Sequence, residues 1–331
     1  MPIWSTIQRF IAEHGAAALV TLAQAQGSSP REAGARMVVA PDGTFTGTIG
    51  GGALEWGALA EAQALLARRE RVARLDKALG PDLGQCCGGR VLLTIERFDA
   101  ADHAAVAALA EAEQDGVLTT IAVAGSDGRL SRRIAEQNEG RSPRPAYEVQ
   151  SDGRIYERFG EEATPFYLFG AGHVGRALAV ALAPLPFAVT WIDTRPGAIP
   201  ETCPANVTAI AQGDPVELLG RAPDGAFIAV MTHSHALDLD LVIAALKADR
   251  FAYVGLIGSA TKRARFTAAM HKMGMAGDAI DRLVCPIGLT TIRDKAPAAI
   301  AASIAAQVLI ARERQQAVTA SATETRRSRH G

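Results

Sequence analysis

Two kinds of residue in this sequence can do chemistry: an adjacent pair of cysteines and several glycine-rich loops. The cysteines stand in the stretch Gly84-Gln85-Cys86-Cys87-Gly88-Gly89. Thiolates are soft ligands and nucleophiles, and nearby backbone N–H donors favour the thiolate form, so this loop suits a soft metal or sulfur transfer. The pair lacks the Cys-x-x-Cys spacing of a tetrahedral zinc site, and a disulfide between neighbours would be strained. The structural alternative is that Cys86 or Cys87 packs in the core.

A glycine fingerprint typical of dinucleotide-binding folds lies in the second half of the sequence. The apolar run 166–169 leads into Gly170-Ala171-Gly172-His173-Val174-Gly175 and then into a helical pattern. In such folds the first glycine allows a tight turn, the second lets a phosphate approach the backbone, and the third lets the helix pack on the strand. Asp193 follows about 20 residues later, where these folds place the carboxylate that accepts a ribose hydroxyl. The alternative is a scaffold whose glycines only close a turn.

Two loops in the first half also offer donors to an anion. The loop Gly27-Ser28-Ser29-Pro30-Arg31 combines an unusual backbone with two hydroxyl groups and Arg31, and its alternative is an ordinary turn with a solvated arginine. Gly50, Gly51 and Gly52 precede a helix and expose backbone N–H groups to a ligand in the functional interpretation. Glu55 lies in the first turn of that helix, where it either complements the helix dipole or faces the ligand.

A pair of histidines follows an apolar strand over 226–231, at the strand end where doubly wound folds bind ligands. Side chains two residues apart diverge unless the backbone is extended. The spacing of His233 and His235 therefore argues against a metal bound by both. It favours one histidine that faces the ligand and one that caps the next helix. Gly258-Ser259, at the start of a basic helix over 261–273, is a further candidate anion site.

These residues need an α/β scaffold to position them. In the first half, hydrophobic periodicity predicts helices over 3–14, 58–68 and 100–113 and strands over 16–23, 36–40, 45–49, 72–75, 91–95 and 118–124. In the second half it predicts strands over 166–169, 187–192, 206–210, 226–231 and 251–257, with helices over 176–183, 261–273 and 296–312. We therefore predict an α/β protein with an N-terminal domain over 1–137, a linker over 138–164, a Rossmann-like doubly wound parallel-sheet domain over 165–312 and a disordered tail over 313–331.

Composition limits the classes of function. The chain has 331 residues, and its 34 basic and 35 acidic residues nearly cancel, which gives no long-range field towards nucleic acid or an anionic membrane. The N-terminus lacks a signal pattern, and no apolar run approaches the ~20 residues needed to cross a bilayer, so a cytoplasmic location is expected. The four cysteines are too few for a disulfide framework in a chain of this length, and we expect Cys86, Cys87, Cys203 and Cys285 to be thiols.

Six motifs together resemble those of the XdhC/CoxI family, and the Gln-Cys-Cys-Gly-Gly form resembles its xanthine dehydrogenase accessory branch. The resemblance runs from near the N-terminus to about Arg312, and its motifs are 27–31, 50–55, 84–89, 170–175, 231–235 and 285–289. It implies a molybdenum-cofactor chaperone without turnover of its own. Such a protein presents the cofactor to a cysteine desulfurase for exchange of an oxo for a sulfido ligand and helps insert it into the molybdenum subunit of xanthine dehydrogenase, in purine catabolism.

The sequence departs from the family pattern at two places. Many relatives have cysteine where this chain has Ala53, so a metal-ligand role falls on Cys86 or Cys87. Many relatives also have Asp-Ile-Gly near 290–292, where this chain has Thr-Thr-Ile.

The residue chemistry fits this cofactor, a pterin dithiolene with a terminal phosphate, which we expect between the two domains. The predicted cofactor-binding residues are Arg31, Gly50, Gly51, Gly52, Glu55, Cys86, Cys87, Gly170, Gly172, His173, Gly175, Asp193, His233 and His235, with molybdenum near Cys86 or Cys87. The rival functions are an NAD(P)-dependent oxidoreductase, with Arg195 accommodating a 2′-phosphate, and a nucleotide-sensing regulatory module. Neither explains the cysteine loop, and no hydride-transfer constellation accompanies the fingerprint. A nucleotide at the Rossmann site and a homodimer through the alanine-rich helices stay open.

Overall fold

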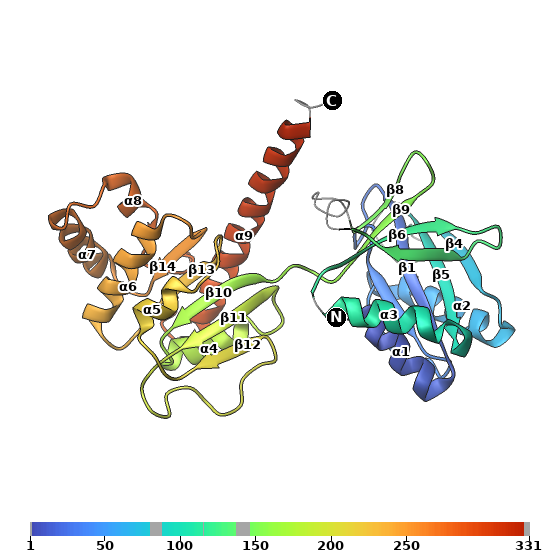
Figure 1. Cartoon of the computed structure of the whole chain (residues 1–331), viewed down its shortest axis with the longest axis horizontal. Helices are drawn as coiled ribbons and strands as arrows, with labels where there is room; N and C mark the ends of the chain where they lie inside the picture. Colours follow the sequence, from blue (N-terminus) through green and yellow to red (C-terminus); the bar gives the residue numbers. More distant parts are fainter. Residues whose placement is uncertain (1, 80–87, 115, 137–145, 328–331) are drawn as a thin grey trace. The chain divides into compact units, whose positions relative to one another are not determined.

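The chain forms two compact units, Met1–Glu162 and Ala163–Gly331 (Figure 1). The computed structural model describes residues 2–79, 88–114, 116–136 and 146–327, with side chains as far as residue 318. Cys86 and Cys87 therefore lie outside the described residues. No helix in the described part of the chain is long and apolar enough to cross a membrane.

The first unit is built on a five-stranded antiparallel sheet with the order β3-β2-β1-β5-β4. Its strands are β1 (Ala16–Gln26), β2 (Arg36–Val39), β3 (Phe45–Gly47), β4 (Val72–Ala78) and β5 (Arg90–Asp99). Helix α2 (Gly52–Arg68) packs on one face of this sheet through Leu54 and Leu65. Helices α1 (Ile3–His14) and α3 (His103–Gln114) pack on the other, and α3 is preceded by the short helix η2 (Ala100–Asp102). Because both faces are covered, residues 16–23 of β1 are buried without a break, which explains the apolar run in the sequence.

A second sheet in this unit has four antiparallel strands in the order β7-β6-β9-β8. They are β6 (Leu118–Ala124), β7 (Leu130–Ile134), β8 (Tyr147–Val149) and β9 (Ile155–Phe159). The prediction of a linker over 138–164 is therefore wrong for 147–149 and 155–159, which form β8 and β9. The turn around Gly153, with φ of +83°, closes a hairpin between these strands and does not mark a domain boundary.

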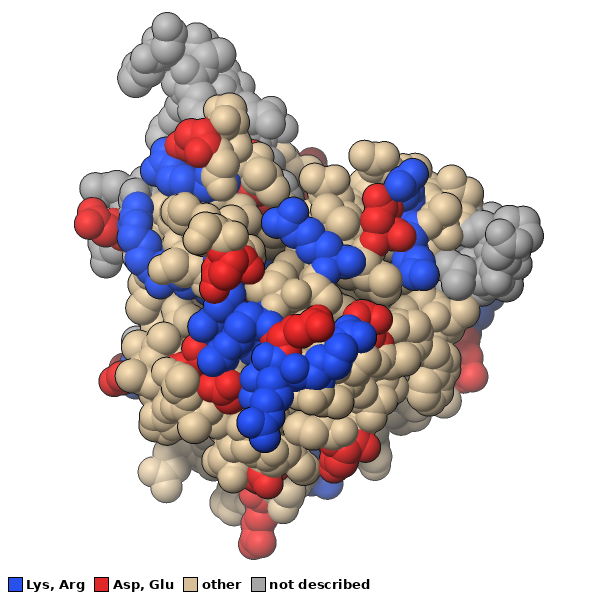
Figure 2. All heavy atoms as spheres, turned by 90° about the vertical axis from the view of Figure 1, so that its right-hand side faces the viewer, with Lys and Arg blue, Asp and Glu red and all other residues tan. Residues whose placement is uncertain are grey.

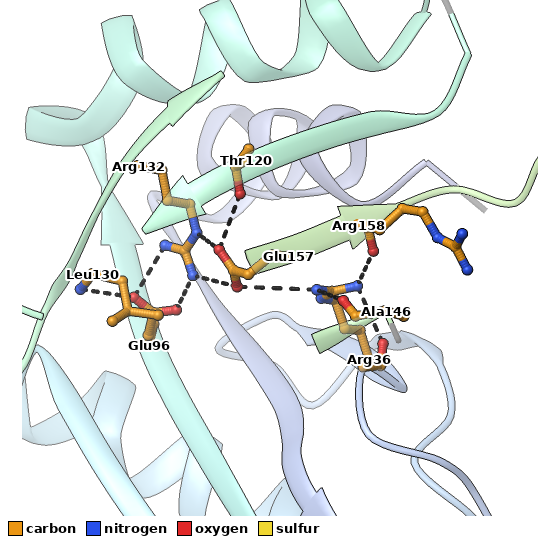
Figure 3. A network of polar contacts seen from close by, with 9 residues as sticks. Arg36, Glu96, Thr120, Leu130, Arg132, Ala146, Glu157 and Arg158 are labelled. Atoms are coloured by element: carbon orange, nitrogen blue, oxygen red, sulfur yellow. Dashed lines mark hydrogen bonds and ion pairs between the residues drawn. The ribbon is translucent and has the colours of Figure 1, made fainter. Parts of the chain in front are cut away.

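A buried charge network joins the two sheets (Figure 3). Arg132 of β7 donates to Glu96 of β5 at 2.5 Å and to Glu157 of β9 at 2.6 Å. Arg36 of β2 donates to the carbonyl of Arg158 at 2.8 Å and lies 4.0 Å from Glu157. Burial by itself would raise the pKa of Glu157, but the charge and hydrogen bonds of Arg132 outweigh it and hold that pKa below its usual value.

Surface charges of opposite sign also lie next to one another, as Figure 2 shows for one face of the molecule. In the first unit, Arg71 and Arg97 each contact Asp99 at 3.1 Å, and Arg129 contacts Asp102 at 2.5 Å. The charges of these elements therefore neutralise one another, in keeping with the near-zero net charge of the chain.

The second unit is a parallel six-stranded sheet with the order β12-β11-β10-β13-β14-β15. Its strands are β10 (Thr164–Phe169), β11 (Phe187–Ile192), β12 (Val207–Ile210), β13 (Phe227–Val230), β14 (Tyr253–Leu256) and β15 (Leu283–Val284). Helices α5 (Pro215–Gly220), α6 (His235–Ala248), α7 (Ala260–Lys272) and α8 (Gly277–Asp281) share one core, and α4 (His173–Ala181) and α9 (Pro297–Arg327) share another. This arrangement confirms the predicted α/β class and the doubly wound Rossmann-like sheet.

Helix α9 corrects the predicted tail. Residues 313–331 were expected to be disordered because they are polar and lack apolar periodicity, yet the helix continues to Arg327. Its first half is anchored by Ala301, Ile304 and Val308 in the core, so the costly first turn is already formed there. Extending an existing helix through alanine, glutamine and arginine requires only favourable propagation.

Candidate functional site

The glycine loop between β10 and α4 keeps its three glycines for different reasons. Gly170 has φ of +114°, and a Cβ there would lie 2.2 Å from the carbonyl oxygen of Met231 at the end of β13. A Cβ on Gly175 would lie 2.2 Å from the carbonyl oxygen of Gly170. Gly172 has an ordinary φ of −70°, and no atom of the described residues lies within 4 Å of a Cβ placed there. Neither backbone strain nor internal packing therefore requires a glycine at 172, whereas close approach of a ligand to the backbone would.

Asp193, at the end of β11, holds this loop in place. Its carboxylate accepts the N–H of Ala171 at 2.7 Å, and from Arg195 it accepts the N–H at 3.1 Å, Nε at 3.0 Å and Nη2 at 2.7 Å. Burial by itself would raise the pKa of Asp193, but these hydrogen bonds keep it below its usual value. A carboxylate accepts about four hydrogen bonds, so a ribose hydroxyl would have to displace a donor of Arg195.

A hollow lies at the carboxyl ends of β10, β11 and β13. It is lined by Phe169, Gly170, Ile192, Asp193, Thr194, Pro215, Thr232, His233 and Leu237. The strand order reverses between β10 and β13, so the hollow occupies the place where doubly wound sheets bind ligands. Gly170, Asp193 and His233 are the predicted site residues that line it.

The two histidines have separate surroundings. His233 lines the hollow, whereas Nδ1 of His235 lies 3.1 Å from Nη2 of Arg265 on α7. The expectation that one histidine caps α6 is wrong, because Ser234 is the N-cap residue and its hydroxyl accepts the N–H of Leu237. In the part of the chain that the structure describes, no group of three or more His, Cys, Asp or Glu side chains could hold a metal ion.

A buried ion pair that the sequence did not predict holds Thr232, a residue that lines the hollow. Asp238 of α6 is fully buried and accepts the hydroxyl of Thr232 at 2.7 Å and Nζ of Lys262 at 2.6 Å. Lys262 also donates to the carbonyl of Ile257 at 3.0 Å. The only signal in the sequence is an acid in the first turn of a helix, which by itself suggests a helix-dipole role.

In the first unit, three glycine motifs that are far apart in sequence lie against one another. A Cβ on Gly89 would lie 2.3 Å from the carbonyl oxygen of Ser28, and a Cβ on Gly27 would lie 3.2 Å from Cα of Gly89. A Cβ on Gly50 would lie 2.5 Å from Cγ of Pro30. We call the loops 27–31, 50–52 and 88–89 the glycine cluster. Gly88 directly follows the cysteine pair, so the described flank of the cysteine loop belongs to this cluster.

Glu55 binds back onto the loop that precedes its own helix. Its Oε2 accepts the hydroxyl of Thr48 at 2.6 Å and the N–H groups of Ile49 at 3.2 Å and Gly51 at 3.3 Å. The three glycines 50–52 have φ of +135°, +76° and +61°, so each adopts a conformation that favours glycine. These contacts favour a structural role of Glu55 at the helix N-terminus, where it also complements the helix dipole, over a carboxylate that faces a ligand.

Three other predicted site residues are exposed, and the two cysteines outside the cysteine loop lie in the second unit. Arg31, Gly172 and His173 are exposed. Cys285 is buried in the core of the second unit, which raises the pKa of its thiol. Cys203 is half-buried and lies 3.5 Å from the carbonyl of Pro200.

Comparison with solved structures supports this two-unit fold. A structure described as a xanthine dehydrogenase from Bacillus halodurans has a TM-score of 0.76 and 19% sequence identity, over 95% of this chain and 96% of that chain. The uncharacterized protein YqeB of Escherichia coli (strain K12) is 27% identical over 300 residues, which is 88% of this chain. The chain spans 43% of the length of YqeB.

Family models match both units. Residues 166–308 match the XdhC Rossmann domain, and residues 10–76 match the XdhC and CoxI family. The first match contains the glycine loop and the hollow, and the second contains the loops 27–31 and 50–52 of the glycine cluster. Because each unit matches a model of the same family, the chain belongs to the XdhC and CoxI family.

Proposed function

We propose that this protein is a cytoplasmic accessory protein of xanthine dehydrogenase. It binds the molybdenum cofactor, presents it to a cysteine desulfurase for sulfuration, and helps insert it into the molybdenum subunit of the dehydrogenase. The observation that carries the proposal is that loop 27–31 packs against Gly50 on one side and against Gly89, two residues beyond the cysteine pair, on the other. Family membership supports it independently.

The glycine cluster has the donor chemistry that such a cofactor needs. Gly51 is the N-cap residue of α2 and has no side chain, and no described atom lies within 4 Å of a Cβ placed on it. The N–H of Gly51 itself binds Glu55, so an anion at this helix N-terminus would be held by the backbone N–H groups that follow, with the exposed cation of Arg31 nearby. The thiols of Cys86 and Cys87, which follow from the sequence, add soft ligands for molybdenum. The bound cofactor supplies the molybdenum centre, and the residues of this chain hold and orient it.

The hollow in the second unit is the second anion site of the proposal. There Gly172 leaves the start of α4 open, and His233 lines the cavity. It suits a phosphate or a nucleotide, with Asp193 acting through the loop that it holds. An NAD(P)-dependent oxidoreductase is the weaker alternative, because the acceptor positions of Asp193 are already taken by Ala171 and Arg195.

The test is a series of single Cys→Ser variants. Serine keeps the size of cysteine but replaces a thiol of pKa about 8.5 with a hydroxyl that stays protonated, so affinity for a soft metal falls. We expect Cys86→Ser or Cys87→Ser to empty the protein of molybdenum and to abolish rescue of dehydrogenase activity in cells that lack the wild-type protein. Cys203→Ser is the matched control and should retain both.

Two measurements decide the outcome: molybdenum per folded protomer and the fluorescence of the oxidised pterin released from the purified protein. Full molybdenum occupancy and full rescue by the Cys86→Ser/Cys87→Ser double variant would contradict the thiol-ligand part of the proposal. Release of nicotinamide without molybdenum or pterin from the wild-type protein would instead support the oxidoreductase.

A further inference from the structure

Helix α2 presents an uncharged stripe to solvent beside the glycine cluster. Ala53, Trp56, Gly57 and Ala60 are all exposed, and their spacing places them on one face of the helix. Leu54 and Leu65 point the other way and are buried in the core of the first unit. A solvent-facing helical stripe normally carries charged residues, so this face is unusual.

Trp56 is the unusual member of the stripe. The chain has three tryptophans, and Trp4 and Trp191 are 0% and 2% exposed, whereas Trp56 is 70% exposed. An aromatic ring of this size usually contributes to a core or an interface. Trp56 belongs to none of the buried clusters of its own unit, so it is available to a ligand.

Gly57 gives an independent indication. Glycine inside a helix is less stable than alanine, and no described atom lies within 4 Å of a Cβ placed at 57. Internal packing therefore does not require a glycine there. Its absent side chain, together with the small side chain of Ala53, leaves open space on the exposed face of α2.

Trp56 lies near the start of α2, close in sequence to the backbone N–H groups at the helix N-terminus. Side chains of an α-helix lean towards its N-terminus, so the side chain of Trp56 is directed towards the turn that contains Gly52 and Ala53. That turn follows Gly51, the N-cap residue of α2, which has no side chain to cap the helix and whose own N–H binds Glu55. A ligand with an anionic group at the N-terminus would bring a ring attached to it over the first turns of the helix.

We propose that Trp56 is the stacking partner for the planar ring of this ligand, a fused heteroaromatic bicycle of the pterin class. The inference rests on the proposed function of the glycine cluster and names the residue that recognises the ring. Stacking on an aromatic side chain suits any flat π-system, and the anion donors next to it select a ring that carries a phosphate. The rest of the stripe carries no group larger than a methyl, which is too little for a specific protein interface of some 20–30 residues a side.

The test uses the full chain with two probes: the oxidised phosphorylated pterin derived from molybdenum cofactor, and glycerol 3-phosphate as an anion without a ring. The variants are Trp56→Leu, which keeps apolar area without a π-face, and Trp56→Phe, which keeps a ring. Val123→Ala, at an exposed apolar position of β6, is the control. Calorimetry gives the dissociation constants, and acrylamide quenching reports whether the pterin shields Trp56, because the other two tryptophans are already buried.

We expect Trp56→Leu to weaken pterin binding about tenfold, in the range measured for loss of one base-stacking aromatic, and Trp56→Phe to weaken it less. Neither variant should change glycerol 3-phosphate binding, and pterin should protect Trp56 from acrylamide. Equal pterin affinity in the wild type and Trp56→Leu, without protection, would overturn the stacking role and leave the proposed function standing. If the wild-type protein does not bind the pterin probe, the proposed cofactor site is wrong, and the stacking role of Trp56 is wrong with it.

Discussion

Gly172 and Gly175 belong to one fingerprint, yet the structure separates their roles. Gly175 lets the start of α4 approach the carbonyl of Gly170, which is a matter of folding. Gly172 faces open space, so its small size matters only when a ligand arrives. A fingerprint glycine can therefore be assigned to folding or to binding once its surroundings are known.

This difference gives a matched pair of variants. Gly175→Ala places a methyl group 2.2 Å from a backbone oxygen, so the second unit should lose stability by about 1–3 kcal/mol. Gly172→Ala should leave the urea midpoint unchanged and weaken binding of a phosphate-bearing ligand about tenfold or more. Urea unfolding and ligand titration on both proteins measure the two effects. A Gly175→Ala variant as stable as the wild type would contradict the folding role of Gly175. Unaltered ligand binding by Gly172→Ala would contradict the binding role of Gly172.

Asp193 illustrates how a residue predicted to contact the ligand can act through the backbone instead. Its position after β11 is the one expected for a ribose-binding carboxylate. In the structure it is 7% exposed and joins the N–H of Ala171 to the guanidinium of Arg195. The side chain contributes to the shape of the glycine loop whether or not a ribose binds.

At the scale of secondary-structure elements, the four-stranded sheet of the first unit is fastened to the five-stranded sheet by charge as well as by apolar packing. Arg132 on β7 lies between Glu96 on β5 and Glu157 on β9, with side chains no more than 6% exposed. A buried cation between two carboxylates is stable only while all partners stay ionised, because an unpaired buried charge is costly.

This arrangement predicts acid sensitivity of the first unit. Since the folded-state pKa of Glu157 lies below the usual value of 4.5, its stabilising effect is fully present above pH 4.5 and is lost as the pH falls through the lowered pKa. Glu157→Gln should reduce the free energy of unfolding by about 3 kcal/mol at pH 7, and the difference from the wild type should shrink in acid. Urea unfolding between pH 7 and pH 3 measures both.

The control for this prediction is Asp152→Asn. Asp152 pairs with Arg154 at 2.6 Å in the exposed β8–β9 turn, where solvent screens the interaction. It should change the stability little at neutral pH. Equal stability of Glu157→Gln and the wild type at pH 7 would mean that the network does not fasten the sheets.

At the scale of the whole molecule, the chain carries two independent sets of cores. The clusters around Val20 and Trp4 contain only residues of the first unit, and those around Phe169 and Phe166 contain only residues of the second. Each unit has more than 150 residues, a length at which a single domain buries enough apolar surface to fold alone.

We therefore expect fragments 1–162 and 163–331 each to fold when produced separately. Each should show a cooperative urea transition, with a denaturant slope smaller than that expected for 331 residues unfolding together. Circular dichroism should show mixed helix and strand in both. A fragment without a cooperative transition would mean that its unit depends on the other for stability.

The sequence by itself determined the features that neighbouring residues encode. The alternating strands and helices of the second unit and the fingerprint at 170–175 are visible there because each strand, turn and helix is a contiguous segment with its own periodicity. Helices α5 and α8 were not predicted, since 6 and 5 residues are too few to show a helical period. The sequence predicts a linker where strands β8 and β9 form, because their hairpin turn resembles a domain boundary.

Only the tertiary structure decided which distant residues meet. Gly89 lies against Ser28, Lys262 pairs with Asp238, and Arg132 bridges Glu96 and Glu157, although nothing local marks these partners. Each contact is selected by the need to satisfy a buried charge or to fit two backbones at a distance that only glycine allows. Such requirements arise only when the elements are packed, and they turned separate glycine motifs of the sequence into one candidate site.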